Sequence, residues 1–160
     1  MSLTRRQLVV LFAAGAPAVP MLASAHHGWS SFDQDRPLYL EGRVVTSKWQ
    51  NPHAELLIEV TPALKLPSDL KQRTLPAQSS SVDGAALLAK AALPKRSDRR
   101  WELELAPLTR MEAWKVSEIK PGGQVSAVGF TTKDEKGDAV MRVEYLFVDG
   151  KAYGLRSSPA

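Results

Sequence analysis

The feature that most constrains the fold of this chain is a succession of short segments in which apolar and polar residues alternate. Alternation at period two is typical of β-strands, because successive side chains of a strand point to opposite faces. It occurs over residues 37–48, 54–60, 101–105, 124–132 and 139–148. Between the third and fourth of these segments, the apolar residues of 108–114 fall at roughly helical spacing instead. The sequence therefore predicts three strands, one short helix and two further strands.

This order of elements predicts an all-β protein. It matches an OB-fold-like five-stranded small barrel, in which one short helix lies between the third and fourth strands. A plain five- or six-stranded meander with a peripheral helix is the alternative, and an immunoglobulin-like sandwich is disfavoured because it needs about seven strands. Gly42 and Gly129 interrupt their strands, and a glycine inside a strand usually indicates a bulge or a sharp bend.

Residues 62–100 break the alternating pattern. They contain four prolines, the run Ser79-Ser80-Ser81 and clustered basic residues, and only the apolar patch 85–93 could form two turns of helix. So long a stretch without a strand pattern is unusual inside a compact domain. We therefore expect a long, partly disordered insertion after the second strand.

The N-terminus has the pattern of an export signal. Arg5-Arg6 precede an apolar run from Leu8 to Ala16, and Ala23-Ser24-Ala25 provides the small residues that signal peptidase recognises. The run is shorter than the ~20 residues needed to span a bilayer. We expect residues 1–25 to be a cleavable signal peptide and 26–160 a single domain in the bacterial periplasm or outside the cell, with no transmembrane anchor. The paired arginines also resemble a twin-arginine signal, so Sec and twin-arginine export both stay open.

Cleavage of this segment changes the charge of the chain. It removes two arginines and no acid, so Lys+Arg falls from 21 to 19 against 17 Asp+Glu, and the formal net charge falls from +4 to +2. A net charge of +2 with mixed signs indicates a solvated surface, and we expect no nucleic-acid partner. The chain has no cysteine, which excludes disulfides and thiolate metal sites and leaves nitrogen and oxygen donors.

Two motifs carry a resemblance to a known family. They are AHHGWSSFD at 25–33 and WQNPH at 49–53, supported by GRV at 42–44 and KPGGQV at 120–125. With these motifs the chain resembles a family of small exported bacterial proteins of unknown function, which begin AHH after the signal peptide and carry W-x-N-P-H. The resemblance covers most of the mature chain outside 62–100. Gly123 stands where the family usually has aspartate, and the resemblance implies no activity.

All three histidines of the chain lie in these two motifs, as His26, His27 and His53. Cleavage after Ala25 would make His26 the first residue, so that its α-amino nitrogen and its imidazole could bind one metal ion together. His53 would add a third nitrogen, in the arrangement called a histidine brace, and His27 could be the third ligand instead. Three nitrogen donors without sulfur favour copper, with nickel or zinc behind it. The alternative is a solvated terminus, with His53 bonded to a turn carbonyl.

Five further residues are expected around these ligands. Trp29, Phe32 and Trp49 could line a pocket, Asp33 could add an oxygen ligand or hold a histidine tautomer, and Asn51 could orient His53. Trp49 could equally be a core residue at the end of the barrel. The charged pairs Glu102 with Glu104 and Arg142 with Glu144 are interpreted as solvated residues on strand faces.

The sequence thus predicts an exported metal-binding protein for copper, which acts through His26, His53 and, as an additional candidate, His27. A metal-free OB-like binding module for a protein or glycan partner in the cell envelope is the alternative. A histidine-brace copper oxygenase is the third choice. We favour a role without catalysis, because the sequence contains no phosphate loop, nucleophile elbow or zinc-protease motif, and it identifies no catalytic residue.

Overall fold

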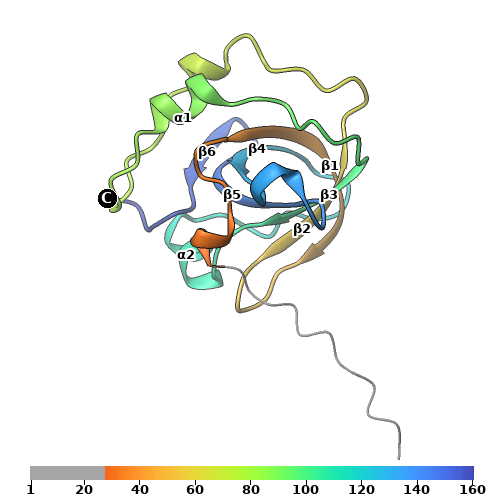
Figure 1. Ribbon diagram of the computed structural model, residues 1–160. Helices are drawn as coiled ribbons and strands as arrows, with labels where there is room; N and C mark the ends of the chain where they lie inside the picture. The colour runs from red at the N-terminus through yellow and green to blue at the C-terminus, as the bar shows by residue number, and fades with distance from the viewer. Residues whose placement is uncertain (1–27) are drawn as a thin grey trace, which may run out of the picture.

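The alternating segments form the strands of a closed barrel in the computed structural model, which describes residues 28–160 (Figure 1). The strands are β1 (Leu38–Lys48), β2 (Glu55–Val60), β3 (Arg100–Glu104), β4 (Gln124–Phe130), β5 (Val140–Val148) and β6 (Lys151–Gly154). The α-helices are α1 (Gly84–Lys90) and α2 (Leu108–Ala113). Three short 3₁₀ turns are η1 (Trp29–Ser31), η2 (Leu70–Gln72) and η3 (Lys133–Glu135).

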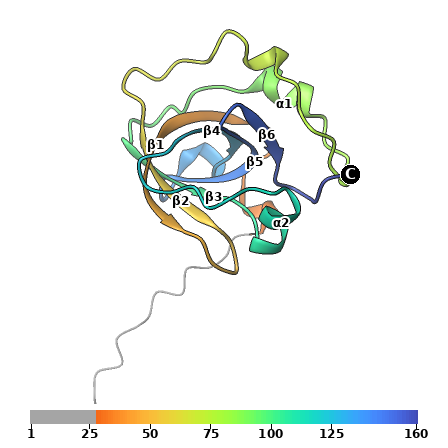
Figure 2. The same cartoon turned by 180° about the vertical axis from the view of Figure 1, so that it is seen from behind.

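The strands run in the order β3-β2-β1-β4-β5-β6, and β3 also pairs with β5. The β3–β5 pairing is parallel and all the others are antiparallel, so five strands close a mixed barrel and β6 extends it beside β5. Helix α2 follows β3 and precedes β4. The prediction of an all-β, OB-fold-like small barrel is confirmed. Figure 2 shows the same barrel from behind, with β6 on its outside.

The two strand glycines have different roles. At Gly42 a side chain is excluded, because a Cβ there would lie 2.3 Å from the carbonyl oxygen of Glu59 on β2. The shift in register between β1 and β2 falls later, between Val44 and Thr46, so Gly42 permits close strand approach and does not mark the bulge. Gly129 does lie at a register shift, between β4 and β5, as the sequence predicts.

The core fills the barrel with the inward side chains of all five closing strands. Its largest member is Trp101, which is 1% exposed, and its other members include Leu38, Leu40, Leu56 and Leu103. Helix α2 adds Met111 to this core. Alternation along β1 and β3 directs every second residue inward, and the neighbouring residues therefore point to the outside of the barrel.

The segment 62–100 lies on the outside of the barrel. It packs there through Leu70, Leu88 and Ala91, which form a second apolar cluster with Tyr39 and Val128 on the outer face of β1 and β4. Helix α1 overlaps the predicted apolar patch 85–93 and begins one residue before it, and the side chain of Asp83 caps the helix by accepting a 2.9 Å hydrogen bond from the backbone N–H of Ala86. The partial disorder of this segment stays a prediction.

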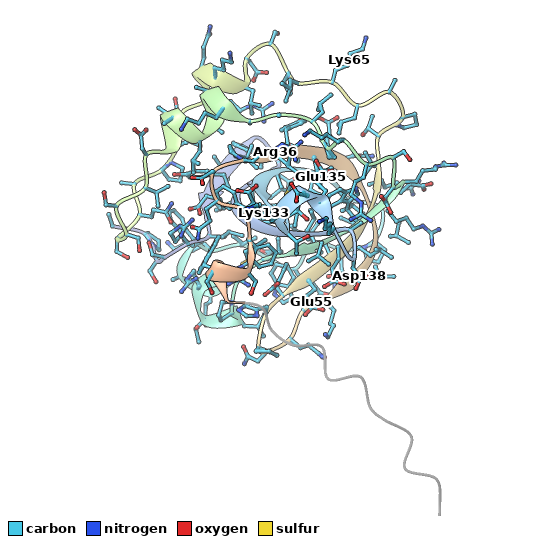
Figure 3. All side chains as sticks on the ribbon, viewed as in Figure 1. Arg36, Glu55, Lys65, Lys133, Glu135 and Asp138 are labelled. Carbon is cyan, nitrogen blue, oxygen red and sulfur yellow. The ribbon has the colours of Figure 1, made fainter. Side chains whose placement is uncertain are left out.

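The end of the insertion is tied to the loop between β4 and β5. The carboxylate of Glu135 accepts hydrogen bonds of 3.0 Å from the backbone N–H groups of Lys95 and Arg96. It also pairs with Arg36, which precedes β1, and the two side chains lie together at one end of the barrel (Figure 3). One carboxylate thus joins three segments that are distant in the sequence.

Within residues 28–160, the helices are too short and too polar for any of them to cross a lipid bilayer.

Candidate functional site

His53 lies in the turn between β1 and β2, after a cis peptide bond between Asn51 and Pro52. The following residue, Ala54, exchanges backbone hydrogen bonds of 2.9 Å with Leu105 and Ala106, just beyond β3. These bonds hold the turn against the end of β3. The imidazole of His53 therefore lies beside Glu104, the last residue of that strand, and the side chain of His53 is 17% exposed.

Both ring nitrogens of His53 lie next to charged groups. Nδ1 is 3.3 Å from the carboxylate oxygen Oε1 of Glu104, and Nε2 is 3.3 Å from the guanidinium nitrogen Nη2 of Arg142. Because a guanidinium can only donate hydrogen bonds, Nε2 must accept and the ring proton of a neutral His53 lies on Nδ1, toward Glu104. A carboxylate next to Nδ1 favours the tautomer that carries its proton on that nitrogen.

Glu104 and Arg142 form an ion pair at the place where the barrel closes. They are register partners on the parallel strands β3 and β5, and the Nη1 of Arg142 donates to the Oε1 of Glu104. The two residues are only 7% and 5% exposed. Burial lowers the pKa of Arg142, and the charge of Glu104 opposes that shift. The guanidinium nevertheless stays charged at neutral pH, since arginine is not deprotonated in proteins.

The N-terminal arm covers this ion pair with an aromatic ring. The indole of Trp29, in η1, contacts two guanidinium groups, and its ring centroid is 5.0 Å from the Cζ of Arg142 and 4.0 Å from the Cζ of Arg156. The edge of the ring meets Phe130 on β4 at a centroid distance of 6.3 Å. Cations stack favourably on an indole face, and desolvation strengthens the attraction. Trp29 therefore fixes the arm against the outer face of β5.

A second buried carboxylate pairs with Arg156, the other arginine that contacts Trp29. Glu144 on β5 is fully buried and pairs with Arg156 through distances of 2.8 Å from Nε and 2.7 Å from Nη2. Gln78, from the insertion, donates a 3.3 Å hydrogen bond to the same carboxylate. Burial raises the pKa of Glu144, although the ion pair with Arg156 opposes the shift. The arginines of two ion pairs therefore contact one indole ring on the outside of the barrel.

The expected site residues lie as follows. His26 and His27 lie outside the residues that the structure describes. Trp29 and His53 are brought to the same group, Arg142. Phe32 is buried, and the backbone N–H of Asp33 donates a 2.8 Å hydrogen bond to Thr131. The side chain of Asp33 accepts a 3.2 Å hydrogen bond from the backbone of Asp35.

Trp49 and Asn51 contact α2. Trp49 packs against the barrel core and, with Leu108 and Met111, lines a groove beside that helix. The side-chain oxygen of Asn51 accepts a 3.4 Å hydrogen bond from the backbone N–H of Leu108, in the first turn of α2. These two residues hold the His53 turn and α2 together.

The interpretation of Glu104, Arg142 and Glu144 as solvated strand residues is wrong. All three point away from the barrel core, as alternation predicts, but the N-terminal arm and the residues around 78 and 156 cover that outer surface. A signal was present in the sequence: Arg142 and Glu144 interrupt a strand whose other residues, 140–148, are all apolar or aromatic. Charges in such a strand indicate a buried pair.

Among residues 28–160, no group of three or more His, Cys, Asp or Glu side chains is placed to hold a metal ion. The described part of the site supplies one imidazole with one carboxylate beside it. An ion bound there would need further donors, and the arm that leads to Trp29 is the segment that carries His26 and His27.

The fold and the site define a small closed β-barrel in which a half-buried histidine contacts a buried carboxylate and a buried arginine beside an N-terminal arm. Residues 16–65 match the family described as "Family of unknown function (DUF6152)". The match spans the arm, β1 and the turn with His53, and it supports the resemblance to a family of unknown function. Neither the curated proteins nor the solved structures give a match to this chain.

Proposed function

We propose that this chain is an exported metal-binding protein whose site combines the histidines of the mature N-terminus with His53. Copper is the preferred ion, with nickel or zinc behind it. One observation carries the proposal: Trp29, only two residues after His27, rests on Arg142, which itself contacts Nε2 of His53. Trp29, which follows the N-terminal histidines closely in the sequence, and the turn that holds His53 thus meet at one guanidinium group.

The chemistry around His53 supports this assignment. Glu104 lies 3.3 Å from Nδ1, and Nε2 faces the guanidinium of Arg142, which stacks on Trp29. A histidine held by a carboxylate through one nitrogen, with the other nitrogen turned to the ion, is the usual arrangement around protein-bound metals. The α-amino and imidazole nitrogens of His26 would supply two more donors, with His27 as the alternative to one of them. The protein's part is to hold these donors in one place.

The test is a titration of Cu²⁺ into the protein that begins at His26, in which binding is monitored by calorimetry and by electron paramagnetic resonance. We expect one equivalent of Cu²⁺ with nitrogen ligands. A matched protein with one extra alanine before His26 moves the free amine away from the imidazole and should lose the tight site. The variants His53→Ala and His27→Ala then show which imidazole completes it. The proposal would be contradicted if no Cu²⁺ binding were detected, or if the extra alanine left the binding unchanged. It would also be contradicted if the intact mass of the exported protein showed a first residue other than His26.

A second candidate, a metal-free binding module for a glycan or protein partner, has its own observation. A groove of about 660 Å³ lies on the outside of the barrel, between η2 and the β5–β6 hairpin, away from His53. Its wall combines one aromatic ring, Phe147, with Arg73 stacked over it at 4.8 Å, and the polar side chains of Glu41, Gln124 and Asp149. A partner that co-purifies with a protein showing no metal binding would favour this function.

A further inference from the structure

We propose that a pocket between the two ends of the insertion binds a small amphipathic anion, an organic carboxylate with an apolar chain. The pocket has a volume of about 590 Å³, which lies within the range of about 300–1,000 Å³ that is typical of small-molecule sites. We call it the mouth pocket. Its lining comes from residues 60–64, 93, 94 and 96–99, and from the core residues Leu40 and Trp101. The inference goes beyond the proposed metal site and uses none of its residues.

The inner wall of the mouth pocket is apolar, because it lies where the two apolar clusters of the protein meet. Leu40, Val60 and Trp101 belong to or pack against the barrel core, and Leu93 packs against the second cluster on the outer face of β1 and β4. Leu64 packs against both clusters.

The apolar surface that a ligand would meet comes from the half-buried side chains. Leu40 and Trp101 are 0% and 1% exposed, so they lie beneath Val60, Leu64 and Leu93, which are half-buried. An apolar chain placed there would remove the exposed parts of these three side chains from water, which is favourable.

Hydrogen bonds hold the walls of the mouth pocket in place. The backbone N–H of Val60, the last residue of β2, donates a 2.8 Å hydrogen bond to the carbonyl oxygen of Arg99, just before β3. On the opposite wall, the Nη1 of Arg96 donates a 2.9 Å hydrogen bond to the carbonyl oxygen of Glu135, and the Cζ of Arg96 lies 5.5 Å from the ring centroid of Trp101. A pocket whose walls are already ordered costs little conformational entropy when a ligand binds.

The charges of the lining favour an anion. The lining holds two arginines and one aspartate, so its formal charge is +1. The Nε and Nη2 of Arg96 donate to the carboxylate of Asp98 at 2.5 Å and 3.1 Å, so these two charges compensate each other within the wall. Arg99 is therefore the cation of the lining that is left to pair with a ligand.

Arg99 has donors to offer to such a ligand. Its side chain is 80% exposed, and its Nη2 donates a 3.1 Å hydrogen bond to Glu59, which is 44% exposed and does not line the pocket. An exposed ion pair of this kind contributes little free energy. The Nε and Nη1 of Arg99 have no side-chain or backbone partner among residues 28–160.

The ligand class follows from these two halves of the pocket. A guanidinium presents parallel N–H groups that match the two oxygens of a carboxylate. A carboxylate at Arg99 with its chain against Leu64 and Leu93 would use both the charge and the apolar wall, whereas a neutral ligand would use only the wall.

The experiment is a titration of decanoate into the protein purified from cells that express the full chain. Calorimetry measures the affinity, and NMR of the methyl groups locates the site. We expect one decanoate per protein, with shifts of the methyl resonances of Leu64 and Leu93. 1-Decanol has the same chain without the charge and should bind about tenfold more weakly.

Two neighbouring arginines give a matched pair of variants. Arg99→Gln should bind decanoate about tenfold more weakly than the wild type and should no longer distinguish it from 1-decanol. Arg100→Gln removes the same charge from the adjacent residue, which does not line the pocket, and should bind decanoate as the wild type does. Both arginines are exposed, so neither change should disturb the fold.

The proposal is refuted if the methyl resonances of Leu64 and Leu93 do not respond to decanoate. It is also refuted if the wild type binds 1-decanol as tightly as decanoate, or if Arg99→Gln and Arg100→Gln weaken binding equally. Shifts of the same resonances with protein concentration alone would show that a second copy of the chain covers the pocket, and would refute it too. None of these outcomes bears on metal binding, because His53, Glu104 and Arg142 do not line the mouth pocket.

Discussion

At the scale of single residues, the outer face of β5 holds an unusual concentration of charge. Arg142 and Glu144 are both almost completely buried, and each forms an ion pair with a residue of another segment. Buried ion pairs add little net stability, because desolvation offsets much of the attraction, but removal of one partner is costly. These pairs therefore define a geometry around Trp29 and His53 more than they stabilise the barrel.

Glu144 gives a prediction on pH. Burial raises its pKa in the folded protein above the ordinary value of 4.5, so the folded state binds this proton more tightly than the unfolded state does. The contribution of Glu144 to the free energy of unfolding is then greatest at low pH and falls as the pH rises from about 4.5 through the raised pKa. The variant Glu144→Gln lacks this contribution.

The measurement is the free energy of unfolding of the wild type minus that of Glu144→Gln, by denaturant titration between pH 4 and pH 8. All other titrating groups are common to the two proteins, so they largely cancel. We expect the difference to fall as the pH rises. A difference that stays constant, or that grows with pH, would show that Arg156 and Gln78 outweigh burial at this carboxylate.

At the scale of elements, the insertion 62–100 covers one side of the barrel and is held there by a few buried apolar residues. Leu88 of α1 is 1% exposed and packs with Leu70, Tyr39 and Val128. The insertion also supplies Gln78, which bonds to Glu144, so its position affects the charged cluster. In Figure 1 the insertion, which includes α1, runs along one side of the barrel. The C-terminal residues contact it there, because the backbone N–H of Ser79 donates a 2.9 Å hydrogen bond to the carbonyl oxygen of Ser158.

We predict that Leu88→Ala lowers the free energy of unfolding by about 2–5 kcal/mol, because it leaves a cavity in the second apolar cluster. Leu66, in the same insertion, is 41% exposed, and Leu66→Ala should change the stability by no more than about 0.5 kcal/mol. Thermal and denaturant unfolding of the two variants decides the point. Equal effects would mean that α1 does not fold onto the barrel as described.

At the scale of the whole molecule, closure of the barrel depends on a short parallel seam. β3 and β5 pair only from Glu102 with Val140 to Glu104 with Arg142, whereas β1 and β4 pair from Leu38 with Gly129 to Arg43 with Gln124. Parallel pairing is slightly less stable per residue than antiparallel pairing. The charged cluster and the arm lie over the β3–β5 pairing. The candidate site therefore lies at the strand pairing that we expect to be the weakest in the barrel.

We predict that the seam opens more readily than the rest of the barrel. Native-state hydrogen exchange should give the amides shared by β3 and β5, such as Glu102, a lower opening free energy than those between β1 and β4. Glu104→Gln should lower the protection of the seam selectively. Uniform protection throughout the barrel, in both proteins, would contradict this view of its closure.

The sequence by itself determined the five strands that close the barrel, the single helix between β3 and β4 and the barrel class, because period-two alternation and the turn residues act locally, whereas β6 was not predicted. It also predicted the position of the insertion, the bulge at Gly129 and the turn at Asn51-Pro52, and it identified His53 as a candidate ligand. Only the tertiary structure decided that Glu104, Arg142 and Glu144 are buried. Alternation states which residues point out of the barrel, but whether a distant segment covers them depends on how the arm, the insertion and the C-terminus pack. That packing made Arg142, which the sequence pattern left on a solvated face, the neighbour of both Trp29 and His53.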